Sequence, residues 1–281
     1  MSILRDPRAR FGLAALAALI ALAALAPLLS PGDANAQPDV VAMRFLSPLA
    51  TDTRGTFHLL GTDRFGRDVW SRLLFGARIS LLVGVLAMAI STLIGVAVGS
   101  VAGVYHRRVG ATLMGLTDFA LALPRVVLLL LLTALWRPGA GLVIVVLGLT
   151  GWMTIARLVY GEARVLAAKP FVESAYALGA APARVIRRHI LPNTLTPVIA
   201  AAALGIGNTI MLEAGLSFLG LGVQPPTPSW GNMIASGRDT LVNAPWVAMA
   251  PGAALVLVVV ACTLLGDAVR DRFDPTVHYG K

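Results

Sequence analysis

The hydrophobic and polar positions of this chain fall in long blocks rather than alternating at short intervals. Six stretches lack Asp, Glu, Lys and Arg, apart from one Arg in the third, and they cover residues 11–29, 79–104, 119–136, 138–156, 194–212 and 240–266. A membrane-spanning helix needs about 20 apolar residues at about 1.5 Å of rise per residue. The blocks therefore predict an all-α integral membrane protein with six transmembrane helices.

Composition supports a membrane protein and argues against one that binds nucleic acid. Of the 281 residues, 57% are hydrophobic and 13% are charged, and the net charge is +9. The basic residues are not interleaved with aromatic ones in a nucleic-acid-binding stripe, so we expect no nucleic-acid partner. They concentrate in the loops that are cytoplasmic if the N-terminus is inside, which predicts cytoplasmic N- and C-termini. The segment after the first span departs from this bias, with six arginines between residues 44 and 78.

The N-terminal stretch has two alternative interpretations. Basic residues before an apolar run, followed by Ala34-Asn35-Ala36, are typical of a cleaved signal peptide. The run at 11–29 is longer than the roughly 7 to 15 residues of a signal core, so we predict a retained first helix. Residues 1–57 are assigned to this transmembrane segment and to an external linker rich in Pro, Gly, Asp and Thr.

An external amphipathic segment is predicted at residues 58–78, just before the second span. Thr62 or Asp63 is expected to cap a helix in which Asp63 and Arg67, and likewise Asp68 and Arg72, stand four residues apart. Such a helix would lie at the interface between membrane and water. The remaining residues, 79–281, form the predicted core domain.

A basic and only moderately apolar insert, residues 171–193, lies between the fourth and fifth spans. Apolar positions at helical spacing, followed by Gly179 and Pro182, predict a helix, a turn and a second helix, which Pro192 is expected to end. Its arginines favour the cytoplasmic side of the membrane. The insert is either an element that transmits force from a partner or an ordinary amphipathic loop lying on lipid headgroups.

Three ionisable residues at the ends of the apolar spans are candidates for a translocation path. Asp118 and Arg125 stand seven residues apart at the start of the third span, so they are expected on one helix face. They would line a path or form an interhelical pair, and Arg125 could instead extend to the inner interface. Glu213, which follows the fifth span, would line a path or pair with a neighbouring span.

The stretch after Glu213 is expected to be irregular. Its turn-forming residues exclude a continuous helix, and they are Gly220, Gly222, Pro225, Pro226 and Pro228. Backbone of this kind persists near a membrane only where protein or a water-filled cavity shelters it. Trp230, which follows, is expected at the outer membrane interface.

The sequence contains no recognisable catalytic or metal-binding constellation. The phosphate-binding pattern GxxxxGK[ST] is absent from it, so any ATP would have to be bound by a partner. The four histidines lack metal-ligand spacing, and the single cysteine, Cys262, lies within the last span. We therefore expect neither an enzyme nor a metal or cofactor site.

The insert resembles the EAA loop of ABC importer permeases in residues Glu173, Ser174, Ala175, Gly179, Leu191 and Pro192. It departs from the family pattern in having Ser174 where that pattern has Ala and His189 where it has Ile. The run RHILPN at 188–193, the stretch 61–78, and the motifs LSFLGLG and PPTPSWG at 216–231 resemble the dipeptide, oligopeptide and nickel branch. Four such signatures stand in the family's order.

This resemblance implies a type I ABC importer permease of the bacterial cytoplasmic (inner) membrane. It implies as partners a homologous second permease, two ABC ATPase subunits that bind the ATP, and an extracytoplasmic solute-binding protein. The insert would hold the coupling helix, and Glu213, Ser217 and Trp230 would belong to the outer gate. Substrates of this branch include dipeptides, longer peptides, glutathione-like compounds and nickel chelates. The alternatives are a stand-alone secondary transporter or channel, and a membrane scaffold.

Overall fold

The computed structural model describes residues 6–105 and 107–273, which are mostly helical. The long helices are α1 (Pro7–Ala24), α3 (Val69–Val104), α4 (Arg107–Ala122), α5 (Arg125–Ala134), α6 (Ala140–Ala167), α9 (Leu191–Phe218) and α11 (Trp246–Phe273). The shorter helices are α2 (Ala26–Leu29), α7 (Pro170–Ala177), α8 (Pro182–Val185), the π-helix η2 (Ile186–Ile190) and α10 (Trp230–Arg238). Two short antiparallel strands, β1 (Ala50–Thr51) and β2 (Phe57–His58), complete the fold.

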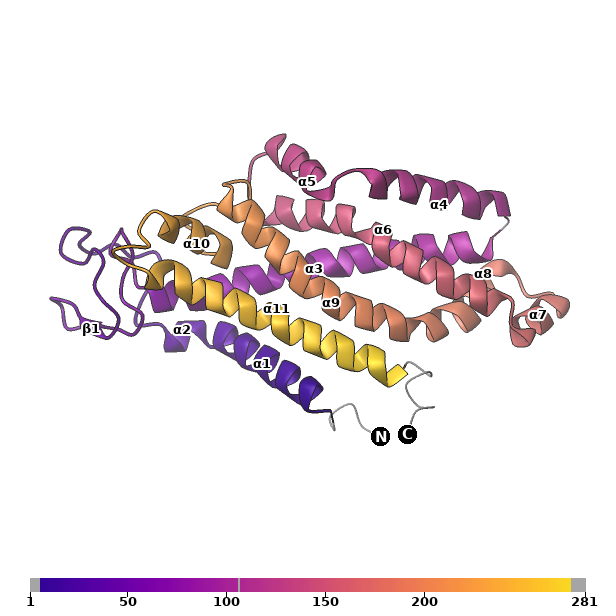
Figure 1. Ribbon diagram of the computed structural model, residues 1–281, viewed down its shortest axis with the longest axis horizontal. Coiled ribbons are helices and arrows are strands. Elements are labelled where there is room, and N and C mark those ends of the chain that lie inside the picture. Colours follow the sequence, from indigo (N-terminus) through magenta and orange to yellow (C-terminus); the bar gives the residue numbers. More distant parts are fainter. Residues whose placement is uncertain (1–5, 106, 274–281) are drawn as a thin grey trace.

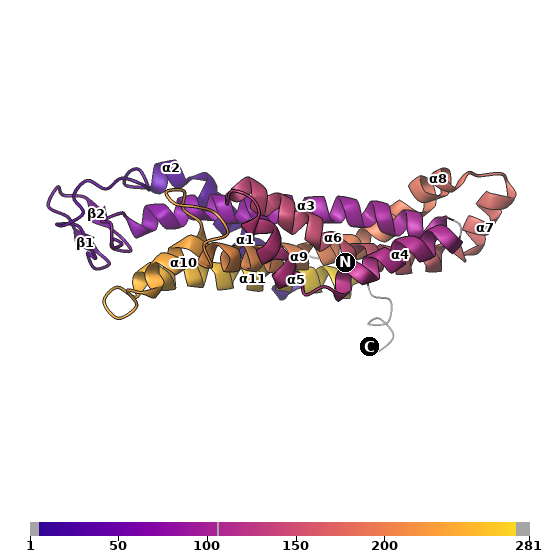
Figure 2. The ribbon, with the colours of Figure 1, turned by 90° about the horizontal axis from the view of Figure 1, so that it is seen from above.

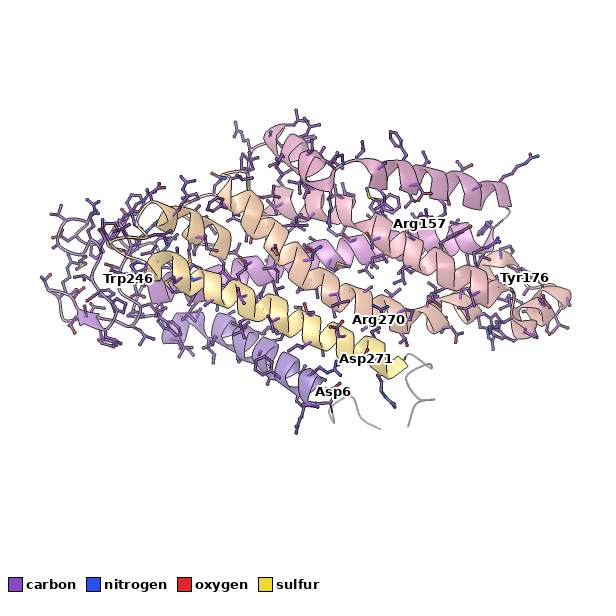
Figure 3. All side chains as sticks on the ribbon, viewed as in Figure 1. Asp6, Arg157, Tyr176, Trp246, Arg270 and Asp271 are labelled. Atoms are coloured by element: carbon purple, nitrogen blue, oxygen red, sulfur yellow. The ribbon has the colours of Figure 1, made fainter. Side chains whose placement is uncertain are left out.

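Apart from α5, the long helices run roughly along one axis and form an elongated bundle (Figure 1). The strands β1 and β2 lie beyond one end of the bundle, and α7 and α8 lie beyond the other, as Figure 2 also shows. The start of α1 and the end of α11 lie together towards the α7 end, where Arg8 and Asp271 form an ion pair of 3.4 Å (Figure 3). The bundle therefore has two distinct ends, which are called the α7 end and the strand end below.

The predicted number of membrane spans is confirmed when one bent helix pair is counted as a single span. Among the described residues, five helices are long and apolar enough to cross a membrane, and α4 with α5 makes a sixth. The boundaries differ from the prediction. Helix α9 continues to Phe218, beyond the expected end at residue 212, and α11 begins at Trp246 rather than near residue 240.

The third span is broken rather than continuous. Helices α4 and α5 meet at an angle of 82°, with the break at Leu123 and Pro124. Proline disfavours helical backbone in the residue before it and cannot donate a backbone hydrogen bond, which accounts for the break. Asp118 and Arg125 lie on different helices as a result, so the prediction that they share one helix face is wrong.

The prediction of a helix beginning at Thr62 or Asp63 is also wrong. Helix α3 begins at Val69, after Asp68, whose carboxylate accepts a hydrogen bond of 2.6 Å from the amide of Ser71. Before it, the Asp63 carboxylate accepts from the amide of Arg67, and Gly66 has a φ of +70°. Short acidic side chains stabilise turns in this way, so the spacing of Asp63 and Arg67 belongs to a turn rather than to a helix.

Small residues allow α3 to pack closely against α6. A Cβ atom on Gly95, Gly99 or Gly103 would lie 2.6 Å from Ile155, 2.5 Å from the Ala156 carbonyl oxygen or 2.5 Å from Ala163, respectively. These three glycines recur every four residues and so share one face of α3. Close approach through small residues is a common way for transmembrane helices to associate. Helices α3 and α6 therefore form the centre of the bundle.

Candidate functional site

The predicted helix, turn and helix at residues 171–193 are confirmed. Helix α7 ends at Ala177, and the turn that follows contains Gly179, which has a φ of +82°. The amide of Gly179 donates to the Tyr176 carbonyl at 2.9 Å, and the amide of Ala180 donates to the Ala175 carbonyl at 3.0 Å. This is the hydrogen-bond pattern of a Schellman motif, which requires a left-handed residue at the position of Gly179. Pro182 then occupies the first turn of α8, as expected.

The expected role of Pro192 as the end of this region is wrong. Helix α8 passes through η2 directly into α9, and Pro192 lies in the first turn of α9. The segment from α7 to η2, residues 170–190, is called the α7–α8 loop below.

A small apolar cluster anchors the base of the α7–α8 loop. Val172 of α7, Val185 of α8 and Ile190 of η2 pack together with Ala163 of α6, and all four are fully buried. The rings of Phe171 and His189 also lie 5.8 Å apart. Because packed cores deform little, a displacement of α7 would be passed to the ends of α6 and α9.

The outer face of the α7–α8 loop is exposed and carries the predicted coupling residues. Glu173 and Ser174 are exposed, while Ala175 is half-buried, and the Ser174 hydroxyl donates to the Pro170 carbonyl at 2.8 Å. Leu178, next to the turn, has 89% of its surface exposed. The sequence analysis did not single out Leu178, although a large apolar residue directly before a turn glycine outside the spans was a visible signal.

Tyr176 lies on α7 near the end of α3, at the extreme of the bundle in Figure 3. Burial raises the pKa of its phenol, and the neighbouring Tyr105 adds to this shift. A phenol with a raised pKa stays neutral at physiological pH. The charged side chains exposed on the loop are therefore Glu173 in its first half and Arg184, Arg187 and Arg188 in its second half.

The two charged residues of the predicted third span have different surroundings. Asp118 of α4 forms an ion pair with Arg157 of α6, and both side chains are about half exposed, at 46%. Figure 3 shows Arg157 on the middle part of α6. Arg125 lies at the start of α5, next to Gly151 of α6. The interhelical pair foreseen for Asp118 exists, with Arg157 as its partner.

Three predicted gate residues come together in one buried cluster at the strand end of α9. The Glu213 carboxylate accepts hydrogen bonds from the hydroxyls of Ser217 at 2.6 Å and of Ser80, on α3, at 3.0 Å. The Ser80 hydroxyl accepts in turn from the amide of Trp230 at 3.2 Å. Of the two alternatives for Glu213, pairing with a neighbouring span matches these contacts. Ser80 was missed because 133 residues separate it from Glu213.

Trp230 is not at an exposed interface, so that prediction is wrong. Its side chain is fully buried, and its indole nitrogen donates to the Leu73 carbonyl at 3.2 Å. The preceding irregular stretch folds back over the helices, since the Asn232 amide group donates to the carbonyls of Val223 and Thr227. The protein itself therefore shelters the irregular backbone, as the sequence required.

A network of buried charges covers the strand end. Asp63 and Arg67 form an ion pair of 2.6 Å, and Arg72 lies 3.9 Å from the same carboxylate. His58 bonds through Nδ1 to Asp68 at 2.8 Å. Buried charges are retained where they are paired and hydrogen-bonded. Residues 58–68 thus form a folded cap rather than an amphipathic helix lying on the membrane.

Asp52 completes this network, with its carboxylate oxygen Oδ2 lying 3.5 Å from Nε2 of His58. Burial acts to raise the pKa of the Asp52 carboxyl, but hydrogen bonds from the amides of Thr56 and Arg54 and the contact with His58 hold it below its usual value. Across residues 6–105 and 107–273, His, Cys, Asp and Glu side chains form no cluster of three that could hold a metal ion.

The architecture, a bundle of membrane spans with a helical loop projecting from one end, is that of a type I ABC importer permease. It is similar to a chain of the MetNI methionine ABC transporter in an inward-facing conformation, with a TM-score of 0.60 and 21% identity over 71% of this chain and 95% of that one. Residues 95–279 match the family described as binding-protein-dependent transport system inner membrane components. The chain belongs to this family, and it is therefore a multi-pass inner membrane protein.

Curated relatives cover almost the whole chain. A peptide transport system permease protein of Brucella abortus is 38% identical over 97% of this chain and 89% of its own length. A peptide permease protein of Brucella suis is 39% identical over 97% of this chain and 88% of its own length. The dipeptide transport system permease protein DppC of Alkalihalophilus pseudofirmus is 37% identical over 78% of this chain and 72% of its own length. The resemblance found in the sequence motifs is confirmed.

Proposed function

We propose that this chain is the permease subunit of an ABC importer that carries peptides into the cell. The observation that carries the proposal is the α7–α8 loop, which projects from one end of the bundle and exposes Glu173 and Leu178. Its base packs on α6 and leads directly into α9. Membership of a family of binding-protein-dependent transport components supports the same function.

The coupling step has a simple mechanical form. Two ATPase subunits would close on ATP, and one of them would hold α7 in a cleft, where Glu173 pairs with a basic group. Closure would move α7 together with the buried cluster of Val172, Val185 and Ile190, and so the ends of α6 and α9. Alternating access then follows as rigid spans tilt against a second, homologous permease. An extracytoplasmic solute-binding protein would deliver the substrate at the strand end.

The distribution of charge supports the orientation that we propose. The α7 end carries Arg184, Arg187 and Arg188 in the loop, together with the start of α1 and the end of α11. Because arginine and lysine accumulate on the cytoplasmic side, we place the α7 end in the cytoplasm. The strand end, with the buried Glu213 cluster, would then face the outside and form part of the outer gate.

The proposed substrate class comes from the relatives that are described as peptide or dipeptide permeases. The motifs of this chain do not distinguish dipeptides from longer peptides, glutathione-like compounds or nickel chelates as the substrate. Nothing in the sequence indicates catalysis, so we propose transport rather than chemistry, with ATP bound only by the ATPase partners. A stand-alone carrier remains the competing function for the experiment to exclude.

Two exposed leucines at opposite ends of the protein provide a matched test. Leu178, in the α7–α8 loop, is 89% exposed, and Leu28, in α2 at the strand end, is 81% exposed. If an ATPase subunit covers Leu178, Leu178→Ser removes about 1.5 to 3 kcal/mol of binding free energy. That loss weakens association by roughly 10- to 100-fold. Leu28→Ser loses no contact with the ATPase.

Copurification from membranes measures this effect. The wild-type chain and Leu28→Ser should each bring down ATPase subunits in constant proportion, while Leu178→Ser should lose most of them. A wild-type chain that transports solute without any ATPase would be a stand-alone carrier and would refute the proposal. Equal ATPase recovery with both variants would show that the ATPase subunit does not bind Leu178 of the α7–α8 loop.

A further inference from the structure

Arg125 places a positive charge within the bundle, level with the middle of α6. One of its terminal guanidinium nitrogens would lie 3.1 Å from a Cβ atom on Gly151, and Gly151 is near the middle of the 28-residue helix α6. At 1.5 Å per residue, this level is at least about 15 Å from either end of α6. The charge-free run of α6 ends at Ala156, five residues or about 7.5 Å beyond Gly151, so Arg125 lies within the apolar part of the span, on the side of the α7 end.

This charge has no counter-ion within the described part of the chain. The Nε atom of Arg125 is buried and has no acceptor there, and the guanidinium makes no hydrogen bond or ion pair with residues 6–105 or 107–273. Asp118, the acidic group seven residues earlier, pairs with Arg157 instead. An unpaired charge at membrane depth is costly and usually marks a substrate or ion pathway.

Arg125 lines a small pocket at the break between α4 and α5. The pocket measures about 50 Å³, and its wall consists of apolar side chains from α4, the break and α5, together with Thr150, Met153 and Thr154 of α6. The Thr150 hydroxyl donates to the Val146 carbonyl, whereas the exposed Thr154 has no hydrogen bond among the described residues. A carboxylate group fits this volume, but a whole peptide does not.

One face of α6 connects the pocket with the α7 end. Thr154, Arg157, Gly161 and Arg164 follow one another at intervals of three or four residues, and all are exposed. Residues at this spacing share a helix face. A face that bears a hydroxyl and two guanidinium groups is unsuited to lipid and suited to a water-filled path. Arg125 therefore lies beside this path rather than in a sealed interior.

We propose that Arg125 binds the carboxylate of the transported solute within the membrane-spanning bundle. The guanidinium offers a rigid set of donors that match a carboxylate in two parallel hydrogen bonds, and the apolar wall strengthens that contact. The pocket admits only the end of a molecule, and a peptide presents its C-terminal carboxylate at an end. This inference rests on the proposed importer function and adds a specificity residue to it.

The first test compares a peptide with its amide in the assembled importer. Wild type, Arg125→Gln, Arg125→Lys and the control Arg137→Gln are reconstituted into vesicles with the ATPase subunits and saturating solute-binding protein. Arg137 is exposed between α5 and α6, outside the pocket. ATP-driven uptake of Ala-Ala-Ala should fall about tenfold in Arg125→Gln. Uptake of Ala-Ala-Ala amide should not change, Arg125→Lys should be intermediate, and Arg137→Gln should match wild type.

The second test asks whether water and solute reach position 125. The chain has one cysteine, Cys262, so Arg125→Cys can be labelled specifically in a Cys262→Ala background. A charged, membrane-impermeant thiol reagent should label this position, and labelling should slow during transport of Ala-Ala-Ala. Leu129→Cys, four residues further along α5 at a site that is 1% exposed, should not react.

The outcomes separate the two proposals. An equal loss of uptake for the peptide and its amide, or no loss, would overturn the role of Arg125 while leaving importer function intact. An unreactive Arg125→Cys would also overturn it, because an acidic residue of the second permease or lipid would then cover the position. A wild-type complex that retains its ATPases but takes up neither compound would instead overturn the peptide substrate class.

Discussion

Replacing Gly179 by valine should uncouple transport from the ATPase subunits, because it disturbs the α7–α8 loop and leaves the membrane spans intact. Gly179 has a φ of +82°, a region in which a β-branched residue is an outlier. Left-handed backbone costs an ordinary L-residue about 1–2 kcal/mol. The Schellman hydrogen bonds of Gly179 and Ala180 depend on that backbone. Such a cost lowers the ratio of native to non-native turn conformers by roughly 5- to 30-fold.

The spans should tolerate this change. A Cβ atom on Gly179 would meet no other atom within 4 Å, so the substitution creates strain in the turn but no clash. Membrane levels of Gly179→Val should therefore equal those of wild type, as measured by quantitative immunoblotting of washed membranes. ATP-driven uptake by the reconstituted importer should fall, and the loss should be no greater than the roughly 5- to 30-fold change in the ratio of native to non-native turn.

Two control variants separate the backbone effect from side-chain size. Gly179→Asn should retain most of the uptake, since asparagine tolerates left-handed backbone. Gly141→Val adds the same side chain at an exposed position near the start of α6, where a Cβ atom also meets nothing within 4 Å, and it should keep wild-type uptake. Wild-type uptake by Gly179→Val would refute the mechanical reasoning. Equal losses in Gly179→Val and Gly179→Asn would show that the left-handed turn is not what matters.

Two further predictions concern stability. Gly99→Val should lower the thermal midpoint of the purified protein, because its Cβ atom would lie 2.5 Å from the Ala156 carbonyl oxygen and overpacking costs about 1–3 kcal/mol. The control Gly115→Val places its Cβ atom in open space and should leave the midpoint unchanged. Equal midpoints for the two variants would contradict the tight α3–α6 contact. The pKa of Asp52 in the folded protein lies below its ordinary value of 3.8. The ionised carboxylate therefore stabilises the fold above pH 3.8, and this stabilisation is lost as the pH falls from 3.8 through the folded-state pKa. Hydrogen exchange of residues 50–58, corrected for intrinsic rates, should therefore rise below about pH 4, and an Asp52→Asn variant with the same acid response would exclude this cause.

Features with local causes could be predicted from the sequence. The length of the apolar runs is enough to place most spans, because each hydrogen-bonds its own backbone within the membrane. Gly179 and Pro182 similarly determine the turn and the start of α8 through their own backbone preferences. The break at Pro124 was hidden because the apolar run continues across it, and hydropathy alone does not distinguish one span from two short helices.

Features that depend on distant contacts could not be predicted in the same way. The spacing of Asp63 and Arg67 suits both a helix and a turn, and the turn forms because the Asp63 carboxylate accepts backbone amides. The contact between Ser80 and Glu213 joins two spans that no pattern in either span connects. Trp230 has a side chain typical of a membrane interface, yet the fold of the preceding loop carries it into the core.

Helix α9 gives the proposed mechanism its geometry. It runs for 28 residues, about 42 Å, from the end of the α7–α8 loop to Glu213 and Ser217. A continuous helix transmits displacement along its length, so movement at η2 would reach the buried cluster that Glu213 forms with Ser80 of α3. Arg125 lies on α5, which packs on α6. Helix α6 joins the two proposed roles, because it lines the Arg125 pocket with Thr150, Met153 and Thr154 and also supports the base of the α7–α8 loop. The carboxylate-binding role of Arg125 can fail in experiment while the coupling role of the loop stands, but it does not survive the loss of importer function.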